Sequence, residues 1–391
     1  MQHMEKYKQH LESLRESGNL RQLRDITLHD EHIMFQGKDM VNLSSNDYLG
    51  LGADQTLWQE FLQTEAESEN GFFPGSACSS RLLTGNHSAY QELEETLASL
   101  YKTEAALVFN SGYHANMGIL PALAGSKDLI LADKLVHASI IDGIRLSSAK
   151  CIRFPHNDLD RLEKILAKER NEYEHVFIVT ESIFSMDGDL ADLQRLVEIK
   201  EHYNALLYVD EAHALGVRGE TGLGCIEEFG LLGKIDLLVG TFGKAIASQG
   251  AFVACNQILK EYLVNTMRTL IFTTGLPPWS VKWTNFVMQR LASMKKERTH
   301  LSEISNALRK TILAYGLETA GESNIVPIII RDMSKTLQLS KYLCEQGFFV
   351  LPIRPPTVPA GTERLRISLT AAISNEQIHQ FSEILCKHIG K

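Results

Sequence analysis

The sequence lacks a run of about 18 consecutive apolar residues, the length that a membrane-spanning helix requires. Its first ten residues are polar and charged, without the apolar segment of a secretory signal peptide. It has only six cysteines, and no two of them form a C-x-x-C pair, so neither a disulfide framework nor a redox motif is indicated. We therefore expect a cytoplasmic protein whose cysteines are mostly buried apolar residues.

An excess of positive charge is also missing. The 39 lysines and arginines are outnumbered by 48 aspartates and glutamates, giving a net charge of −9. This balance argues against nucleic acid or an anionic membrane as the main partner, and an anionic substrate would need a local basic site. With 44% apolar and 22% charged residues in 391, the composition is that of an ordinary globular protein with two or three structural units.

The chain divides into three parts by its patterns. Residues 1–52 carry helical charge patterning between Glu5 and Arg24, then a short strand and a turn-rich segment. Residues 53–284 alternate apolar strand candidates with helical patterns, which indicates a parallel sheet covered by helices on both faces. Residues 285–391 mix helices with short strands, which predicts a smaller α+β domain.

The strand candidates of the large part are short and apolar. They are Ala105–Phe109, Leu129–Leu131, Cys151–Phe154, Val176–Thr180, Leu206–Val209, Leu237–Val239 and Ala251–Ala254. Two capping-box signatures predict helix starts, one over residues 88–91 and one over residues 374–377. One long helical region is expected from about residue 281 to residue 315.

A lysine stands among small residues just after one of these strands, in the segment Thr241-Phe-Gly-Lys244. Burial disfavours an ammonium ion, so it lowers the pKa from about 10.4 toward neutrality and makes the amine a nucleophile. Taken alone, the pattern fits a surface lysine at a turn equally well.

Polar clusters follow four other strand candidates. In an open parallel sheet the carboxyl ends of the strands meet at one edge, and ligands bind there. The clusters are therefore expected to converge on the lysine. They occupy residues 110–114, 133–139, 181–189 and 210–213.

Each cluster offers a distinct chemical group. Ser111 and Gly112 precede a helical pattern, and the free amides of a helix N-terminus can hold a phosphate, to which Thr241 could add a hydroxyl. Asp210 ends a buried strand, where a carboxylate needs a cationic partner. A phosphate site, a buried acid and a lysine together indicate pyridoxal phosphate, which forms a Schiff base with lysine and needs an acidic partner for its ring nitrogen. A flat side chain such as His137 could stack on that ring.

Other kinds of site are less well supported. A metal could bind Asp210, Glu211 and His213, but there is no H-E-x-x-H motif and no further ligand at a telling spacing. The glycines of residues 219–224 do not form a nucleotide-binding motif after a strand, and residues 240–244 are too short for a P-loop. The alternative to a pyridoxal-phosphate enzyme is a binding protein without a cofactor, or a metal protein. Four further residues are expected to be surface, core or packing residues: His87, His156, His175 and Cys78.

In chain order, the motifs resemble those of the α-oxoamine synthases, a family of fold-type I pyridoxal-phosphate enzymes. The resemblance implies a mostly parallel central sheet, a short N-terminal segment and a smaller C-terminal α+β domain, in a homodimer with its active site at the interface. The motifs span nearly the whole chain: Ser44–Gly52, Arg81–Asn86, Ser111–Tyr113, His137–Ser139, Ser185–Asp189, Asp210–His213 and Thr241–Lys244.

The resemblance also implies roles for single residues. Lys244 would hold the cofactor and move the substrate α-proton, Asp210 would pair with the pyridine nitrogen, and His137 would stack on the ring and face the substrate. His213 would contact the cofactor on the side of its ring oxygen. The remaining cofactor contacts would come from Ser111, Gly112, Tyr113, Ser185 and Thr241.

Substrate contacts are implied as well. Arg354 would bind the amino-acid carboxylate, a task that suits a bidentate guanidinium. Asn46, Thr357 and Arg21 would contact substrates, with Arg24 as the rival of Arg21.

The segment Ile353–Ala372 resembles the biotin-pathway branch of the family, with Arg-Pro-Pro-Thr-Val-Pro as its marker. This implies decarboxylative condensation of L-alanine with a pimeloyl thioester of coenzyme A or an acyl carrier protein. Branches that join glycine to acetyl-CoA, or serine to a long acyl donor, stay as alternatives. Residues 245–247 read Ala-Ile-Ala where the family often has Gly-Phe-Gly, which leaves the acyl donor open.

Overall fold

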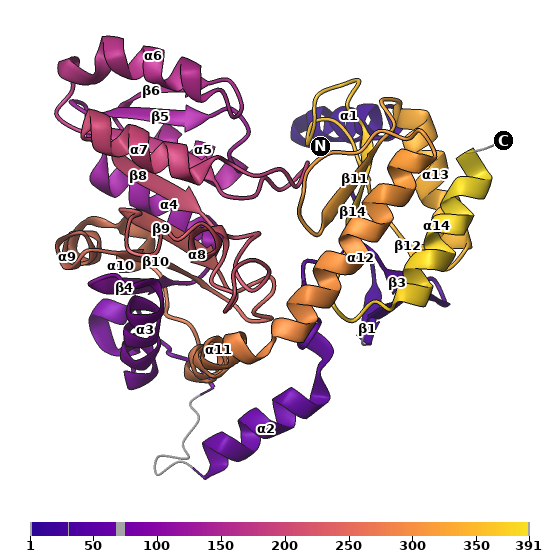
Figure 1. The fold of residues 1–391 in the computed structure, drawn as a ribbon, viewed down its shortest axis with the longest axis horizontal. Coiled ribbons are helices and arrows are strands. Elements are labelled where there is room, and N and C mark those ends of the chain that lie inside the picture. The colour runs from indigo at the N-terminus through magenta and orange to yellow at the C-terminus, as the bar shows by residue number, and fades with distance from the viewer. Residues whose placement is uncertain (1, 30, 68–74, 390–391) are drawn as a thin grey trace.

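The structure is a computed structural model and describes residues 2–29, 31–67 and 75–389. The larger body, drawn at the left of Figure 1, is a seven-stranded sheet between helices; the smaller body at the right holds two short sheets and the C-terminal helices. The glycine- and serine-rich composition of residues 71–86 also predicts a loop, and its first four residues lie outside the described residues.

The seven-stranded sheet has the order β4-β10-β9-β8-β7-β5-β6. Four neighbouring pairs in it are parallel, while β10 is antiparallel to both β4 and β9. The strands are β4 (Ala105–Phe109), β5 (Leu129–Asp133), β6 (Lys150–Phe154), β7 (Val176–Glu181), β8 (Leu206–Asp210), β9 (Leu237–Thr241) and β10 (Ala251–Cys255).

The smaller sheets join distant parts of the chain. One has the order β1-β2-β3-β12 and therefore combines N-terminal strands with a C-terminal one; the other has the order β11-β14-β13. Their strands are β1 (Ile26–His29), β2 (His32–Phe35), β3 (Lys38–Asn42), β11 (Ile325–Ile329), β12 (Phe348–Phe349), β13 (Pro352–Ile353) and β14 (Arg364–Ser368).

The helices cover both faces of the large sheet and pack on the small ones (Figure 1). They are α1 (Gln2–Glu16), α2 (Gln55–Ala66), α3 (Ser88–Tyr101), α4 (Gly112–Leu123), α5 (Ala138–Leu146), α6 (Leu159–Glu169), α7 (Leu193–Tyr203), α8 (Cys225–Glu228), α9 (Gln257–Thr266), α10 (Arg268–Ile271), α11 (Pro278–Arg290), α12 (Lys295–Ala314), α13 (Met333–Glu345) and α14 (Asn375–Ile389). Among the described residues, no helix is both long and apolar enough to cross a membrane.

The core follows from side chains that alternate across the pleated strands. On β8, Leu207 and Val209 join one apolar cluster, whereas Tyr208 joins the cluster on the opposite face. Both faces are buried, which explains why these strands read as continuous apolar runs. The first cluster continues into the smaller body through Ile325 and Leu365, so one core links the two bodies.

The mostly parallel α/β architecture predicted from the sequence is confirmed, with local differences. β10 is antiparallel because a short connection without a crossover helix, residues 242–250, joins it to β9. The N-terminal helix ends at Glu16 rather than near Arg24, because Gly18 adopts a left-handed conformation that stops helices. The helix expected over residues 281–315 is broken by a 3₁₀ turn at Leu291–Ser293.

Of the two predicted capping boxes, the one over residues 88–91 was wrong and the one over residues 374–377 is confirmed. Ser88 already lies inside α3, and His87, at the N-cap, makes no side-chain capping bond. Ser374 and Gln377 do bond reciprocally: the amide of Ser374 donates to Gln377 Oε1 at 2.8 Å, and the amide of Gln377 donates to Ser374 Oγ at 3.2 Å.

Candidate active site at the carboxyl edge of the large sheet

Lys244 lies at the carboxyl edge of the large sheet, where the polar clusters of neighbouring strands meet. Its Nζ is 3.0 Å from Nε2 of His213, which follows β8. Burial lowers the pKa of Lys244 to about 8, although the carboxylates of Asp210 and Glu181 act to raise it. The amine is therefore available as a nucleophile close to neutral pH.

Asp210 ends β8 and is held by neutral donors. Asn116 Nδ2 donates to Asp210 Oδ2 at 2.8 Å, and the amide of Ala212 donates to Oδ1 at 2.9 Å. Asp210 is only 5% exposed, and no ion pair is formed by its side chain among the residues that the structure describes. A buried carboxylate of this kind is suited to a cationic ligand group.

Asn116 also connects Asp210 to His137. Its Nδ2 lies 3.0 Å from Ser139 Oγ, which is 2.7 Å from His137 Nδ1, while Tyr208 donates to Asn116 Oδ1 at 2.5 Å. The sequence prediction missed Asn116, although a buried amide in the otherwise apolar helix α4 was a usable signal. His137 itself is exposed, so one face of its ring is open to a ligand.

The predicted anion site has the expected geometry. Helix α4 begins at Gly112, with Ser111 as its N-cap, and the Ser111 hydroxyl accepts from the amide of His114 at 3.2 Å. A methyl group placed on Gly112 would lie 3.5 Å from Thr241 Oγ1, so the helix start and the end of β9 are adjacent. The hydroxyl of Tyr113 donates to Asp142 at 2.5 Å, so this side chain points toward α5.

Glu181 is a second buried acid that the prediction did not single out. It is 3% exposed, and its Oε1 has no hydrogen-bond partner among the described residues. Burial and the nearby charge of Asp210 raise the pKa of Glu181 well above its usual range, although the charge of Lys244 acts to lower it.

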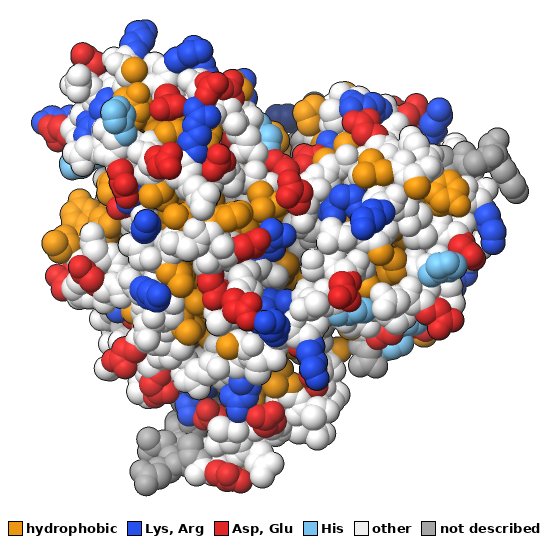
Figure 2. Space-filling view, in the orientation of Figure 1, with side chains coloured by type: hydrophobic (Ala, Val, Ile, Leu, Met, Phe, Trp, Pro, Cys, Tyr) orange, Lys and Arg blue, Asp and Glu red, His pale blue; other side chains and the backbone are white. Residues whose placement is uncertain are grey.

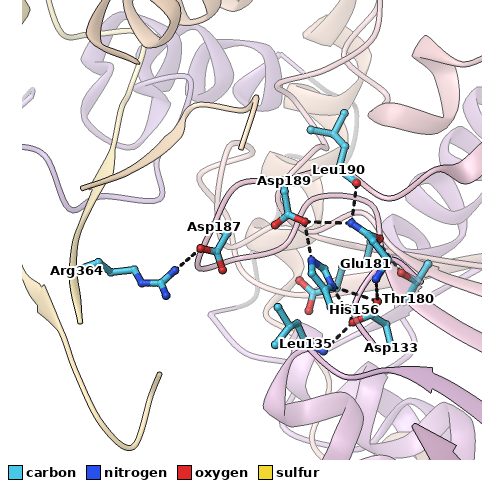
Figure 3. A network of polar contacts seen from close by, with 10 residues as sticks. Asp133, Leu135, His156, Thr180, Glu181, Asp187, Asp189, Leu190 and Arg364 are labelled. Carbon is cyan, nitrogen blue, oxygen red and sulfur yellow. Dashed lines mark hydrogen bonds and ion pairs between the residues drawn. The ribbon is translucent and has the colours of Figure 1, made fainter. Parts of the chain in front are cut away.

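Ser185 belongs to a loop that reaches from the large sheet to the smaller body, here called the bridging loop (residues 182–190). Arg366 Nε donates to the carbonyl of Ser185 at 2.6 Å, and Arg364 pairs with Asp187 (Figure 3). The carbonyl of Gly188 accepts from the amides of residues 322 and 323, at 3.0 and 3.2 Å. Both bodies therefore hold the loop that carries Ser185.

His156, which was expected to be a surface or core residue, is partly buried and contacts two carboxylates. His156 Nδ1 lies 3.0 Å from Asp133 Oδ1, and its Nε2 lies 2.7 Å from Asp189 Oδ2, at the root of the bridging loop (Figure 3). Burial alone would lower the pKa of His156, but hydrogen bonds and charges from the two carboxylates outweigh it and raise the pKa to about 10. The side chain is thus a charged link between β5 and the loop.

We expect His156→Gln to lower the free energy of unfolding by about 2–3 kcal/mol, because it leaves the 1% exposed carboxylate of Asp133 without a counter-charge. Urea unfolding measures this value. His175→Gln is the matched control: His175 also pairs with an aspartate, Asp128, through Nδ1 at 3.0 Å, but its side chain is 63% exposed. The control should lose less than about 0.5 kcal/mol, and equal losses in both variants would contradict the account.

The raised pKa of His156 also predicts that the stability of the protein depends on pH. The folded-state pKa of His156 is raised above its unfolded value of about 6.5, so the folded protein binds more protons between pH 6.5 and about 10. The stabilisation from His156 is complete below pH 6.5 and is lost as pH rises toward 10. Wild type should therefore lose its advantage over His156→Gln across this range, and a constant difference would refute the assignment.

The predicted substrate residues fall into two groups. Arg21, Arg354 and Thr357 line a cavity of about 1090 Å³, and Arg21 Nη2 donates to Thr357 Oγ1 at 3.0 Å. Burial and the charges of Arg21 and Arg24 lower the pKa of Arg354, so this cavity is strongly cationic. Arg24 lines the same cavity, and its guanidinium carbon lies 5.9 Å from the centre of the Phe349 ring.

Asn46 belongs to the other group, because it lines a separate cavity of about 660 Å³ together with Lys244. Arg366 Nη1 donates to its Oδ1 at 3.4 Å. The sequence prediction missed Arg366, although a charged residue between the apolar residues of β14 could have marked it. On the face drawn in Figure 2, acidic and basic side chains are interspersed, so the local arginine clusters do not extend into a basic surface there.

Comparison with known proteins shows which family this chain belongs to. The family model described as aminotransferase class I and II matches residues 38–385. A Haemophilus influenzae protein named "Putative 8-amino-7-oxononanoate synthase" is 51% identical over 97% of this chain and 99% of its own length. A protein of the same name from Neisseria meningitidis serogroup A is 50% identical over 98% of this chain and its own entire length.

Solved structures agree with this placement. Serine palmitoyltransferase from S. paucimobilis, with a bound PLP–myriocin aldimine, matches with a TM-score of 0.90 and 30% identity over 100% of this chain and 98% of that one. The 8-amino-7-oxononanoate synthase of Francisella tularensis matches with a TM-score of 0.75 and 31% identity over 90% and 98%.

Proposed function

The chain belongs to the aminotransferase class I and II family, and from this premise we propose that it is a pyridoxal-phosphate-dependent acyltransferase of the biotin pathway. It condenses L-alanine with a pimeloyl thioester and releases carbon dioxide, the carrier thiol and 8-amino-7-oxononanoate. The observation that carries the proposal is the half-buried amine of Lys244, whose pKa is about 8, beside His213 and the buried acid Asp210. The 8-amino-7-oxononanoate synthase relatives at 50–51% identity support the choice of substrates.

The residues present fit the cofactor. The start of α4 beside Thr241 suits its phosphate, since helix amides there have no partner within the helix. Asp210 accepts two neutral hydrogen bonds and can add the protonated ring nitrogen. The exposed ring of His137 is free to stack on the cofactor ring. Among the described residues, Oε1 of buried Glu181 has no hydrogen-bond partner and is therefore a polar atom available to a ligand.

When bound, the cofactor supplies a ring that accepts electron density from the α-carbon of the amino acid. Lys244 is the covalent attachment point and then, as a free amine, removes the α-proton. Asp210 keeps the ring nitrogen protonated. The hydrogen bonds through Asn116 and Ser139 fix the position of His137 relative to Asp210. Ser111, Gly112, Tyr113, Ser185 and Thr241 position the cofactor.

The cationic cavity is assigned to the substrates. Arg354 binds a carboxylate, Thr357 and Arg21 shape the same cavity, and Asn46 faces the amine site. A pimeloyl chain ends in a second carboxylate, which an arginine-lined cavity accommodates better than the apolar end of a long fatty acyl chain. Arg21 is preferred to Arg24, because it contacts Thr357 whereas Arg24 lies over Phe349.

Accordingly, Arg21→Ala should raise KM for the pimeloyl donor about tenfold, the effect of losing one charge-assisted hydrogen bond, while KM for alanine stays nearly constant. Arg24→Ala is the matched control and should change both values less than threefold. Steady-state kinetics with each substrate varied in turn measure the effects. The reverse ranking of the two variants would transfer the role to Arg24.

A homodimer is part of the proposal. Leu83 and Phe272 are 78% and 71% exposed, and they lie on neighbouring elements, the π-turn at Arg81–Gly85 and the end of α10. Exposed large apolar side chains that are grouped in this way indicate an association surface. Light scattering after gel filtration should give a mass near twice 43.8 kDa, and a monomer at micromolar concentration would contradict the dimer.

A serine-condensing activity is the second candidate, because serine palmitoyltransferase matches the backbone with the higher of the two TM-scores. The deciding experiment supplies the purified holoprotein with alanine, glycine or serine and with pimeloyl-CoA, acetyl-CoA or palmitoyl-CoA. We expect carbon dioxide and an aminoketone only from alanine with the pimeloyl donor. No product from any pimeloyl donor, acyl carrier protein included, would refute the proposal, and product from serine with palmitoyl-CoA would establish the second candidate.

A further inference from the structure

A chain of polar contacts runs behind the proposed active site, from the smaller body to Lys244. Asn46 Oδ1 is 3.2 Å from the hydroxyl of Tyr48, which is 2.6 Å from Nδ1 of His213. On the other side of the imidazole, Nε2 is 3.0 Å from Lys244 Nζ. Tyr48 is 0% exposed and His213 is 5% exposed, so the contact between these two side chains is shielded from water, whereas Asn46 at the end of the chain is exposed.

The position of each proton in this chain follows from which side-chain groups can donate a hydrogen bond and which can accept one. Arg366 has only donors, so the oxygen of Asn46, not its amide nitrogen, must face Arg366 Nη1. The Tyr48 hydroxyl can only donate to that oxygen. Toward His213 Nδ1, however, it can either accept or donate. The guanidinium of Arg366, which has only donors, also lies near the Tyr48 oxygen, and so does Ser368 Oγ, which has no geometric hydrogen bond among the described residues.

The imidazole carries one proton. Burial lowers the pKa of His213 well below its usual value, and the charges of Lys244, Arg366 and His137 act in the same direction. A neutral imidazole has one nitrogen that donates and one that accepts. Its two hydrogen bonds must therefore be donated in the same direction along the chain. Either Lys244 donates to His213 and His213 donates to Tyr48, or Tyr48 donates to His213 and His213 donates to Lys244.

While Lys244 is protonated, its charge allows only one direction in the cofactor-free protein; once the amine is neutral, the direction depends on Tyr48. Below its pKa of about 8 the side chain is an ammonium ion, which donates and cannot accept. His213 Nε2 must then be the acceptor, so the proton lies on Nδ1 and is donated to the Tyr48 oxygen. The Tyr48 hydroxyl in turn donates to Asn46 Oδ1. Every contact in the chain then has one proton.

We propose that Tyr48 is a positioning residue that sets the tautomer of His213 and so decides whether Nε2 faces the site as an acceptor or as a donor. Its hydroxyl can turn from Asn46 to His213 Nδ1. The imidazole proton then lies on Nε2, which can donate to an anionic oxygen of a bound ligand. Only the second half of this inference, the change on ligand binding, rests on the proposed function.

The test uses nitrogen-15 NMR of the full-length protein labelled at histidine, where two-bond correlations distinguish the tautomers. Cofactor-free wild type at pH 7 should show the proton of His213 on Nδ1, and addition of pyridoxal phosphate should move it to Nε2. Above the Lys244 pKa of about 8, where the amine can also accept, Tyr48→Phe removes the partner of Nδ1 and should give a mixture in the cofactor-free protein, whereas wild type keeps the proton on Nδ1. Tyr101→Phe is the control, because Tyr101 is equally buried and its hydroxyl has no partner among the described residues.

A second variant guards against poor folding of Tyr48→Phe. Asn46→Ala removes the alternative acceptor, so above the Lys244 pKa of about 8, where the neutral amine can accept from Nε2, the hydroxyl should turn to Nδ1 and the proton should move to Nε2 without cofactor. In the active enzyme, Tyr48→Phe should lower kcat about tenfold with KM for alanine nearly constant. Above the Lys244 pKa of about 8, a Tyr48→Phe spectrum identical to wild type, or no change in Asn46→Ala, would overturn the inference. A protein that binds no pyridoxal phosphate would refute the proposed function, while the cofactor-free spectra would still decide the role of Tyr48.

Discussion

Lys244→Ala is expected to lower turnover at least about a thousandfold while the protein still folds, because the variant loses both the attachment point of the cofactor and the base that moves the α-proton. The side chain is half-buried, and its contact with His213 at 3.0 Å is the single hydrogen bond that it makes among the described residues. Removing it should therefore cost little stability. Carbon dioxide release from alanine in the presence of pimeloyl-CoA measures the loss, and thermal unfolding measures the fold.

The matched control is Lys234→Ala. Lys234 precedes β9, whereas Lys244 follows it, and Lys234 is exposed. The control should keep full activity. Lys244→Ala with more than a tenth of wild-type activity would contradict the central role of the lysine, and an unfolded Lys244→Ala protein would contradict the claim that the residue serves chemistry rather than stability.

Asp210→Asn should lower kcat about 100- to 1000-fold while the cofactor still binds, because a neutral amide cannot keep the ring nitrogen protonated. The substitution preserves the shape of the side chain. It cannot accept from both Asn116 Nδ2 and the amide of Ala212, since asparagine has one oxygen where aspartate has two. A modest loss of stability is therefore expected beside the large loss of rate.

Asp236→Asn separates these two effects. Asp236 lies next to the amino end of β9 and accepts from the amide of Leu207 at 2.8 Å and from Lys200 Nζ at 2.9 Å. It should lose stability but not rate per folded molecule. Rates within threefold of wild type for Asp210→Asn, or an equal loss of rate in Asp236→Asn, would contradict the assignment of Asp210 to the ring nitrogen.

Much of this site could be predicted from the sequence, because the residues that end parallel strands share one edge. Lys244, Asp210, His213 and His137 each follow an apolar strand directly, and the structure brings them together. The order of the strands could not be derived in this way. It depends on which crossover packs on which face, and β10 runs antiparallel because its connection is too short for a crossover.

The residues that the prediction missed act through others and carry no motif of their own. Tyr48, Asn116 and Arg366 lie on three different elements, and each matters because it meets a residue far away in the chain. The partners of His156 could not be predicted for the same reason, since its two aspartates come from the end of β5 and from the bridging loop. Contacts of this kind depend on tertiary packing, which local patterns do not contain.

The most direct measurement of the central claim is the site of cofactor attachment. The purified protein is incubated with pyridoxal phosphate, reduced with borohydride, digested and analysed by mass spectrometry. The account predicts one modified peptide, with the added pyridoxyl mass on Lys244 and none on Lys234. A protein that takes up no cofactor, or carries it on another lysine while Lys244 stays unmodified, would contradict the account.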